Sequence, residues 1–260
     1  MTAVAALDAL ALDDAAGWAV FLDFDGTLVD LAPQPDAIEV PPDLPALLSR
    51  LRDDLGGALA VVSGRPIADL DRFLAPARLA AAGQHGLERR DAAGRHATAE
   101  IDRAVLSAIA AAMQGLAAAH PGVRVERKSL SVALHYREAP AAAEEARRLA
   151  EALGRAHAEA FDLQPGKMVF EMKPRGSDKG AAVAAFMAEA PFAGRRPLFA
   201  GDDLTDEHGF AAVSGFGGIA IQVGPREPHG ARWKAAHPSE FRAWLEKLAR
   251  KVASAASCGG

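Results

Sequence analysis

Short apolar runs alternate with longer amphipathic segments at both ends of the chain. The runs at 19–22, 58–62, 79–82, 197–200 and 218–223 predict buried strands, because each is a continuous apolar stretch bounded by turn or polar residues. Apolar positions at helical spacing predict helices over 41–55, 66–74, 177–190, 205–213 and 239–252, with a frayed tail after the last. This alternation predicts an α/β fold with a doubly wound, parallel, Rossmann-like sheet.

The middle of the chain follows a different pattern. Residues 101–119 and 141–160 predict helices, while 123–127 and 131–136 alternate apolar and polar positions and predict an antiparallel hairpin with one solvated face. Strands at 161–163 and 168–172, joined through Gln164–Lys167, predict a second hairpin. We therefore expect an inserted α/β domain on an antiparallel sheet at 88–173, and a parallel core formed by 1–87 and 174–260.

Composition narrows the class of protein. Of the 260 residues, 50% are hydrophobic and 24% are charged, which is ordinary for a soluble globular protein. The formal net charge of −5 argues against a nucleic-acid binder, which normally needs a basic face. A single cysteine, Cys258, excludes an internal disulfide and a multi-cysteine zinc site, and it favours a reducing compartment.

The amino terminus lacks the pattern of a signal peptide. No Lys or Arg precedes Arg50, and Asp8, Asp13 and Asp14 interrupt the first apolar residues. No apolar run is long enough to span a bilayer. We therefore expect a cytoplasmic monomer that acts on a small molecule, with neither nucleic acid nor membrane as a partner.

Acidic residues follow two of the predicted parallel strands. Asp23 and Asp25 come directly after the first strand, and Asp202 and Asp203 follow the strand at 197–200. The active site of an open α/β sheet lies outside the carboxyl ends of its strands, so these carboxylates are expected to converge. Carboxylates in close proximity repel one another and favour a cation, and a hard ion with oxygen ligands such as Mg²⁺ suits them.

The individual carboxylates have different expected roles. Asp202 is the better candidate metal ligand and Asp203 would support it, whereas Asp206, in the first turn of the next helix, is expected to be mostly structural. An isolated Asp-x-Asp is more often a turn and a cap. The apolar strand before Asp23, the Gly-Thr after Asp25 and the second acidic pair favour the metal site instead.

Two further residues suit an anion. Ser63 ends the second strand, and its hydroxyl with the free N–H groups before the next helix would form an anion site, although Ser63 could simply cap that helix. Lys179 lies near the start of the helix that Ser177 is expected to cap. A cation there opposes the helix dipole, so a phosphate dianion explains it better than local stability does. Lys173 and Arg175 are alternative cations.

The sequence lacks the motifs that mark several other classes of enzyme. The eight histidines show no His-Glu-x-x-His spacing, which argues against a zinc site. A Gly-x-Ser-x-Gly elbow is absent, which argues against a serine hydrolase of the α/β type. The phosphate-binding loop Gly-x₄-Gly-Lys-Ser/Thr is absent as well, which argues against a P-loop nucleotide enzyme.

The order of the polar motifs resembles that of a known superfamily. Asp23–Thr27, Ser63, Lys179 and Gly201–Asp203 are similar, in this order, to the four motifs of the haloacid dehalogenase superfamily. The inserted segment at 88–173 resembles the second type of cap in that superfamily, as found in its sugar-phosphatase branch.

Within that branch, two stretches resemble the trehalose-6-phosphate phosphatase family most specifically. They are Ala133–Arg137 and Glu171–Gly176. The resemblance extends over most of the chain from Trp18 to Leu248. It implies a Mg²⁺-dependent hydrolase that converts trehalose 6-phosphate to trehalose and phosphate. Gln84 is a departure, because a leucine-like residue is expected before His85-Gly86.

The resemblance also implies roles for the core residues. Asp23 would attack phosphorus and form an aspartyl phosphate, and Asp25 would serve as the acid and then the base. Mg²⁺ would be held by the Asp23 carboxylate, the Asp25 main-chain carbonyl and Asp202. Ser63 and Lys179 would bind the phosphoryl oxygens, next to Gly64 and Arg65 as further substrate-binding residues.

On the inserted domain, Glu126, Lys128 and Glu171 would bind glucose hydroxyls, although each charge taken alone could simply solvate the exposed face of the sheet. Other functions stay open at this point. They are a phosphatase for sucrose phosphate or mannosyl phosphoglycerate, a receiver-like switch, and a sugar-phosphate sensor that binds without turnover.

Overall fold

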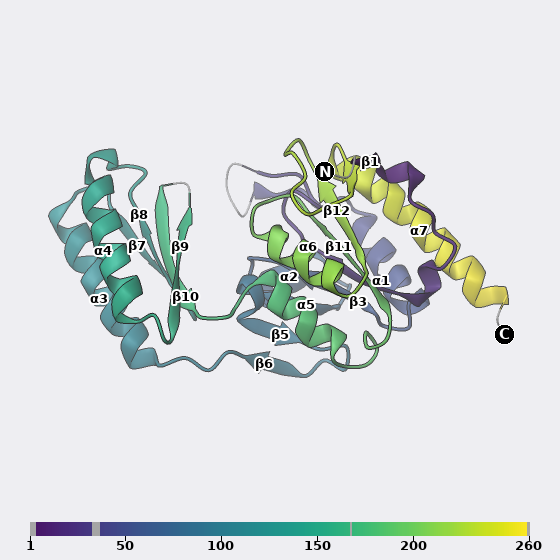
Figure 1. Ribbon diagram of the computed structural model, residues 1–260, viewed down its shortest axis with the longest axis horizontal. Helices are drawn as coiled ribbons and strands as arrows, with labels where there is room; N and C mark the ends of the chain where they lie inside the picture. The colour runs from purple at the N-terminus through teal and green to yellow at the C-terminus, as the bar shows by residue number, and fades with distance from the viewer. Residues whose placement is uncertain (1–3, 33–36, 167, 259–260) are drawn as a thin grey trace. The chain divides into compact units, whose positions relative to one another are not determined.

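A computed structural model describes residues 4–32, 37–166 and 168–258, and the chain forms two compact units (Figure 1). The first unit comprises Met1–Ala97 and Asp178–Gly260, and the second comprises Thr98–Ser177. These boundaries differ from the expected 88–173. The reason is that residues after 87 continue the main sheet, since Glu88–Arg90 pairs antiparallel with Ala80–Gly83.

The described residues of the first unit form a mostly parallel sheet of nine strands, which confirms the predicted fold class. In spatial order they are β1 (Ala5–Ala6), β13 (Trp233–Ala235), β12 (Ile219–Val223), β11 (Arg196–Gly201), β2 (Trp18–Leu22), β3 (Leu59–Val62), β4 (Ala80–Gly83), β5 (Glu88–Arg90) and β6 (His96–Thr98). The long central strands are the ones that the apolar runs predicted. The sequence pattern missed the edge strands, which are only two or three residues long.

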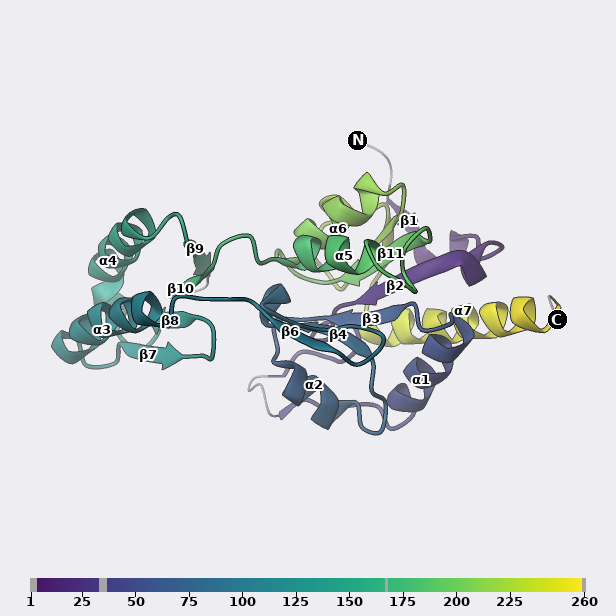
Figure 2. The same cartoon turned by 90° about the horizontal axis from the view of Figure 1, so that it is seen from below.

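Helices cover both faces of this sheet, as Figure 2 shows, with α5 and α6 on one face and α1, α2 and α7 on the other. Their bounds are α1 Leu44–Asp54, α2 Ile67–Phe73, α5 Lys179–Met187, α6 Asp206–Gly215 and α7 Pro238–Cys258. The expected fraying after residue 252 is wrong, because α7 continues to Cys258. Short 3₁₀ turns lie at Leu7–Ala9, Ala15–Gly17, Gln84–Gly86 and, in the second unit, Pro140–Ala142.

The core of the first unit lies between the sheet and its helices. Every residue of β2 is buried, and Phe21 of that strand stacks on Phe192 with ring centroids 5.4 Å apart. Phe186 of α5 packs on the same two rings. Burial of these aromatic side chains stabilises β2 at the centre of the sheet. The loop that follows β2 is thereby anchored to rigid structure.

In the second unit, the described residues form a four-stranded antiparallel sheet in the order β7-β8-β10-β9. Its elements are α3 (Arg103–Ala119), β7 (Arg124–Arg127), β8 (Val132–His135), α4 (Ala143–Ala156), β9 (Phe161–Gly166) and β10 (Val169–Pro174). Figure 1 shows both helices on one face of the sheet, where Leu134 and Met172 are buried with Ile109 of α3. The hairpin turn was expected to include Lys167, which lies outside the described residues.

Among the described residues, each helix is either too short or too polar to cross a bilayer.

Candidate active site

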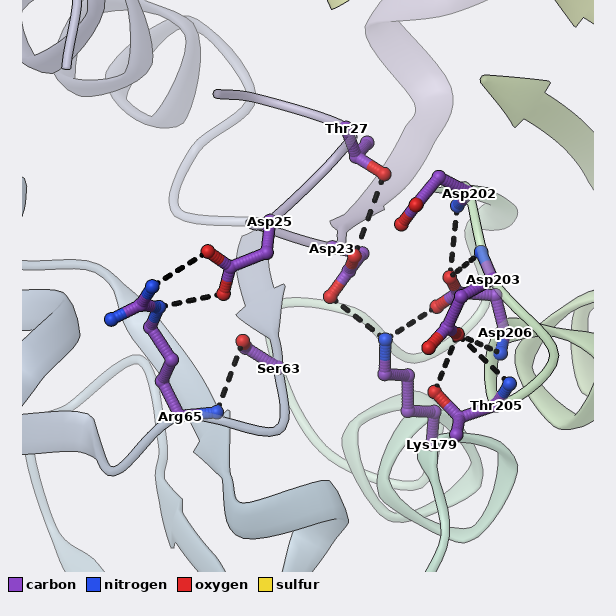
Figure 3. Close-up of polar contacts among 10 residues, drawn as sticks. All are labelled: Asp23, Asp25, Thr27, Ser63, Arg65, Lys179, Asp202, Asp203, Thr205 and Asp206. Atoms are coloured by element: carbon purple, nitrogen blue, oxygen red, sulfur yellow. Dashed lines mark hydrogen bonds and ion pairs between the residues drawn. The ribbon is translucent and has the colours of Figure 1, made fainter. Parts of the chain in front are cut away.

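Three segments far apart in sequence meet at the carboxyl ends of adjacent parallel strands. Asp23 follows β2, Ser63 follows β3 and Asp202 follows β11, and β2 pairs with both neighbours. Figure 3 shows these side chains around one centre, with Lys179 entering from the start of α5. The predicted convergence of polar residues at this edge of the sheet is therefore what the fold produces.

Asp23 lies at the centre of this group and is 4% exposed. One of its oxygens, Oδ1, accepts a hydrogen bond from Lys179 Nζ at 2.8 Å, and Thr27 Oγ1 lies 3.5 Å from Oδ2. Burial raises the pKa of Asp23 to about 7, because the attraction of Lys179 only partly offsets the loss of solvation and Asp202 adds repulsion. Asp23 is thus a desolvated carboxylate with one direct cationic partner.

Gly26 lets the loop after β2 pack closely against the carboxylate of Asp202. Gly26, in the loop after Asp23, has φ of +76°, and a Cβ atom at this position would overlap the carboxylate of Asp202. Any other residue would therefore strain the backbone and displace Asp202. The sequence pattern indicated only that this glycine turns the chain or lets a ligand approach.

Asp206 is more central than the sequence indicated. It is fully buried, and its Oδ2 accepts hydrogen bonds from the backbone N–H groups of Asp202 and Asp203 at 2.9 and 3.0 Å. Its Oδ1 accepts from Lys179 Nζ at 2.6 Å. Burial, and then the charge of Asp23, raise the pKa of Asp206 well above its ordinary value. Asp206 therefore fixes the loop that carries Asp202 and also holds Lys179.

Asp23, Asp202 and Asp206 form a group that could bind a cation. Each offers one carboxylate oxygen, and the three oxygens lie within 4.8 Å of one another. Burial, and then the charges of Asp206 and Asp203, raise the pKa of Asp202 to about 7. Three carboxylates, two of them buried and one half-buried, with Lys179 paired to two of them, leave negative charge that suits a hard divalent ion. Among the described residues, this group contains no carboxylate oxygen of Asp25, whose expected ligand atom is instead its main-chain carbonyl oxygen.

Lys179 is the buried cation of the site. It is 2% exposed and pairs with Asp23 and Asp206. Burial lowers its pKa, but attraction to Asp23 and Asp206 outweighs that effect and raises the pKa overall, so the ammonium stays charged. The residue that caps α5 is Asp178, whose side chain accepts from Ala181 N–H, and not Ser177 as expected.

The alternative cations Lys173 and Arg175 belong to the second unit. The guanidinium of Arg175 donates to the carbonyl oxygen of Ala158 there. Lys179 is therefore the cation that the fold brings to the carboxylates.

Ser63 is 1% exposed and lies directly after β3. Its Oγ accepts a hydrogen bond from Arg65 N–H at 3.2 Å. Pro66, and not Ser63, is the residue before the first turn of α2, so the alternative of a simple helix cap is wrong. The hydroxyl is a donor and an acceptor held at the end of a rigid strand.

Arg65 forms a two-pronged ion pair with Asp25. Its Nε and Nη2 donate to the two carboxylate oxygens of Asp25 at 2.6 and 2.7 Å (Figure 3). The guanidinium carbon also lies 5.7 and 5.0 Å from the ring centroids of Phe24 and Phe73. Arg65 was expected to bind substrate, but the structure shows its donors on the neighbouring carboxylate. Figure 3 shows Asp25 on the opposite side of Asp23 from Asp202.

Asp203 supports the loop and not the Asp202 side chain. Its Oδ1 accepts from the N–H and the hydroxyl of Thr205 at 2.8 and 2.7 Å, and from Asp206 N–H at 3.3 Å. These bonds hold the start of α6. Burial alone would raise the pKa of Asp203, but the attraction of Lys179 and the hydrogen bonds from Thr205 and Asp206 outweigh it and lower the pKa overall.

The sequence did not predict the role of Gln222, which holds the loop after β11 from the neighbouring strand β12. Gln222 of β12 is 2% exposed, and its Nε2 donates to the carbonyl oxygen of Asp202 at 2.8 Å. A lone amide in the apolar run 218–223 was the available signal, because a buried polar group needs a partner.

In the second unit, the candidate sugar-binding residues share the polar face of the sheet. Glu126 of β7 and Glu171 of β10 both pair with Ala133 of β8, which places them in one row across three strands. Lys128 Nζ donates to Glu171 Oε1 at 3.0 Å, and Ser131 Oγ donates to the same oxygen at 2.6 Å. Glu126 Oε2 lies 2.9 Å from His135 Nε2. The face opposite α3 and α4 is therefore charged and already hydrogen-bonded.

Comparison with known proteins relates the whole arrangement to one family. A family model described as trehalose-phosphatase matches residues 21–239. Trehalose-6-phosphate phosphatase of Escherichia coli (strain K12) is 41% identical over 233 residues, which are 90% of this chain and 87% of that protein. The probable trehalose-phosphate phosphatase of Sinorhizobium fredii is 48% identical over 217 residues, which are 83% of this chain and 81% of that protein.

Solved structures agree in fold. The C-terminal domain of C. albicans trehalose-6-phosphate phosphatase matches with a TM-score of 0.78 at 21% identity, over 96% of this chain and 99% of that one. A trehalose-6-phosphate phosphatase related protein matches with a TM-score of 0.70 at 27% identity, over 89% of this chain and 96% of that one.

Proposed function

Because the chain belongs to the trehalose-phosphatase family of phosphoric monoester hydrolases, we propose that it hydrolyses trehalose 6-phosphate to trehalose and phosphate. The observation that carries the mechanism is the placement of Asp23. Its carboxylate is buried between Lys179 and a second acidic loop, as an attacking group for a phosphate dianion requires.

We assign the cation site to Mg²⁺. The donors are carboxylate oxygens, which Mg²⁺ prefers, and the raised pKa values of Asp23 and Asp202 reflect burial and then mutual repulsion, which a divalent ion bound to them would offset. Asp23 and Asp202 would hold the ion, with the main-chain carbonyl of Asp25 as a further ligand and Asp206 beside them. When bound, Mg²⁺ would reduce the repulsion between the Asp23 carboxylate and the phosphate.

In the first step, an oxygen of Asp23 attacks phosphorus, and the bond between phosphorus and the sugar oxygen breaks. Asp25 donates a proton to the departing oxygen, so trehalose leaves as a neutral alcohol. The aspartyl phosphate that remains is a covalent intermediate that water can hydrolyse, so one difficult displacement is divided into two easier ones.

In the second step, water attacks phosphorus of the aspartyl phosphate while Asp25 accepts its proton. The bond between phosphorus and Asp23 breaks, and inorganic phosphate leaves with the carboxylate restored. Asp25 is then protonated again for the next cycle, so protons balance over the two steps. Arg65 binds and orients the ionised carboxylate of Asp25, the form in which Asp25 acts as the base of the second step.

Ser63 and Lys179 bind the phosphoryl oxygens in both steps. Both are almost fully buried and are held by β3 and α5, so they are organised before the charge develops. Glu126, Lys128 and Glu171 of the second unit, which we interpret as the cap, bind the sugar hydroxyls. Their common face supports this assignment.

The decisive experiment is a panel of phosphate esters assayed for released phosphate with and without Mg²⁺. It includes trehalose 6-phosphate, sucrose phosphate, mannosyl phosphoglycerate and p-nitrophenyl phosphate. We expect trehalose 6-phosphate to have the highest kcat/KM, and Asp23→Asn to abolish turnover of every ester because an amide is not a nucleophile here. A higher kcat/KM for another sugar phosphate, or multiple turnover by Asp23→Asn, contradicts the proposal.

A further inference from the structure

Three consecutive residues at the carboxyl end of β4 have a left-handed backbone. The φ angles of Gln84, His85 and Gly86 are 49°, 58° and 98°. Glycine adopts this region freely, whereas side chains disfavour it. Two such side-chain residues in succession persist only where the surrounding structure holds them, and strain of this kind is concentrated at functional sites.

One side of this turn is bonded to the loop that carries Ser63. Gln84 N–H donates to the carbonyl oxygen of Arg65 at 3.0 Å, and His85 N–H donates to that of Ser63 at 2.9 Å. The imidazole of His85 lies against Gly64, because a Cβ atom on Gly64 would be 2.8 Å from both Cε1 and Nε2 of the ring. The ring therefore occupies the space into which this loop could otherwise move.

The other side of the turn packs on the start of α5. A Cβ atom on Gly86 would lie 3.0 Å from the carbonyl oxygen of Asp178 and 3.4 Å from Cβ of Ala182. Asp178 caps α5, and Lys179 is its first residue. The turn thus spans the distance between the two groups assigned to the phosphoryl oxygens, Ser63 on one side and Lys179 on the other.

We propose that His85 is a positioning residue for phosphoryl binding, whose ring and turn fix the Ser63–Arg65 loop relative to Lys179. The assignment rests on the proposed role of Ser63 and Lys179. Preorganised donors bind a phosphoryl group without reorganising, so their spacing governs affinity in the ground state and in the transition state. Without the ring, the loop can shift toward β4 and the spacing is no longer fixed.

His85→Asn tests this assignment, because asparagine tolerates left-handed backbone and removes only the ring. We expect KM for trehalose 6-phosphate and for p-nitrophenyl phosphate to rise together by about tenfold, within the hundredfold that a misplacement of 1 Å can cost. The dissociation constant of inorganic phosphate, measured by calorimetry, should rise equally, with kcat reduced less. His96→Asn, on the exposed strand β6, is the matched control and should change none of these constants.

A purely structural role makes a different prediction. In that case His85→Asn lowers the melting temperature and leaves KM and the phosphate dissociation constant unchanged, which overturns the proposal. The calorimetric measurement needs no turnover. Therefore an inactive wild-type protein that binds phosphate contradicts the proposed function and still tests His85.

The contact itself is tested by combining two variants. Gly64→Ala should weaken phosphate binding because the new Cβ collides with the ring of His85. In the His85→Asn background the same substitution should have a smaller effect, since the ring is gone. Strictly additive effects overturn the proposal. If His85→Asn does not fold, unchanged phosphate binding by Gly64→Ala alone overturns it.

Discussion

Replacing Arg65 with methionine should impair proton transfer by Asp25 more than it impairs substrate binding. Both donors of the Arg65 fork are on Asp25, and the side chains of Arg65 and Asp25 are only 11% and 29% exposed. Methionine keeps an unbranched apolar stem against Phe24 and Phe73, so the packing is largely preserved. The substitution therefore removes the orientation of Asp25 and leaves Asp23, Ser63 and Lys179 in place.

The expected magnitude follows from the two hydrogen bonds. A hydrogen bond to a charged group contributes about 1.5–3 kcal/mol, and about 1.36 kcal/mol corresponds to tenfold in rate. Loss of the orientation that one such bond provides should lower kcat for trehalose 6-phosphate by about 10- to 100-fold. This loss in kcat should not exceed the whole contribution of general acid–base catalysis, which is about 10²–10⁴-fold. Arg65→Lys should give little rescue, because an ammonium cannot bind both oxygens in a planar fork.

Rapid-mixing kinetics with p-nitrophenyl phosphate separates the two proton transfers. Nitrophenolate is a good leaving group and needs little help from an acid, so the attack by Asp23 should survive. Hydrolysis of the aspartyl phosphate still needs Asp25 as a base. Arg65→Met and Asp25→Asn should therefore both release a burst of nitrophenol followed by slow turnover, and the double variant should be no slower than Asp25→Asn alone.

Arg89→Met is the matched control, since Arg89 also pairs with a carboxylate, Glu189, and lies over a phenylalanine ring, Phe186, at 5.0 Å. It should show no burst. The reasoning is refuted if Arg65→Met raises KM for both esters, leaves kcat unchanged and gives no burst. That result would assign Arg65 to substrate binding, as the sequence motif suggested.

Three further predictions concern the cap, the carboxylates and the loop glycine. Lys128→Ala should lower kcat/KM for trehalose 6-phosphate by about 10- to 100-fold and leave p-nitrophenyl phosphate hydrolysis unchanged; a parallel loss of both activities contradicts the cap assignment. The raised pKa of Asp23, about 7 against 3.8, means that metal-free protein loses stability as pH rises from about 4 to 7, so Mg²⁺ should raise the melting temperature more at pH 8 than at pH 5. Gly26→Ala should weaken Mg²⁺ binding in a calorimetric titration because its Cβ displaces Asp202, and an unchanged affinity would exclude this packing.

The central sheet could be predicted because its signal is local. A run such as 18–22 is apolar throughout and buried throughout, so neighbouring residues suffice to identify the strand. Strands β1, β5, β6 and β13 have no such signal, since two or three residues establish neither an apolar run nor a period. Strands β5 and β13 complete the hydrogen bonding of the longer strands β4 and β12, and β6 and β1 then extend the sheet beside them. The boundary of the second unit was placed too early for this same reason.

The residues of the candidate site likewise differ in whether the local sequence is enough to identify their role. Asp23 and Asp202 are identified by their positions after apolar strands, and a parallel sheet brings such positions together. The partner of Asp25 is forty residues away, and the local sequence around Arg65 is equally compatible with a substrate-binding arginine. Asp206 has the sequence signature of an acidic residue in a first helical turn. Its burial against Lys179 and the backbone of Asp202 depends on the tertiary fold.

The electrostatics of the assembled site imply that cation and phosphate bind cooperatively. Asp23, Asp202 and Asp206 all have raised pKa values, because burial removes solvation from these carboxylates, they repel one another, and the attraction of Lys179 does not fully offset these two effects. A phosphate dianion placed beside Asp23 would add to this repulsion. A divalent cation held by the same carboxylates would instead make the site attract the phosphate. By linkage, each ligand must then raise the affinity of the other by the same factor. Chelation of the metal should therefore weaken the binding of inorganic phosphate itself and not only stop turnover, which separates an electrostatic role of the cation from a purely catalytic one.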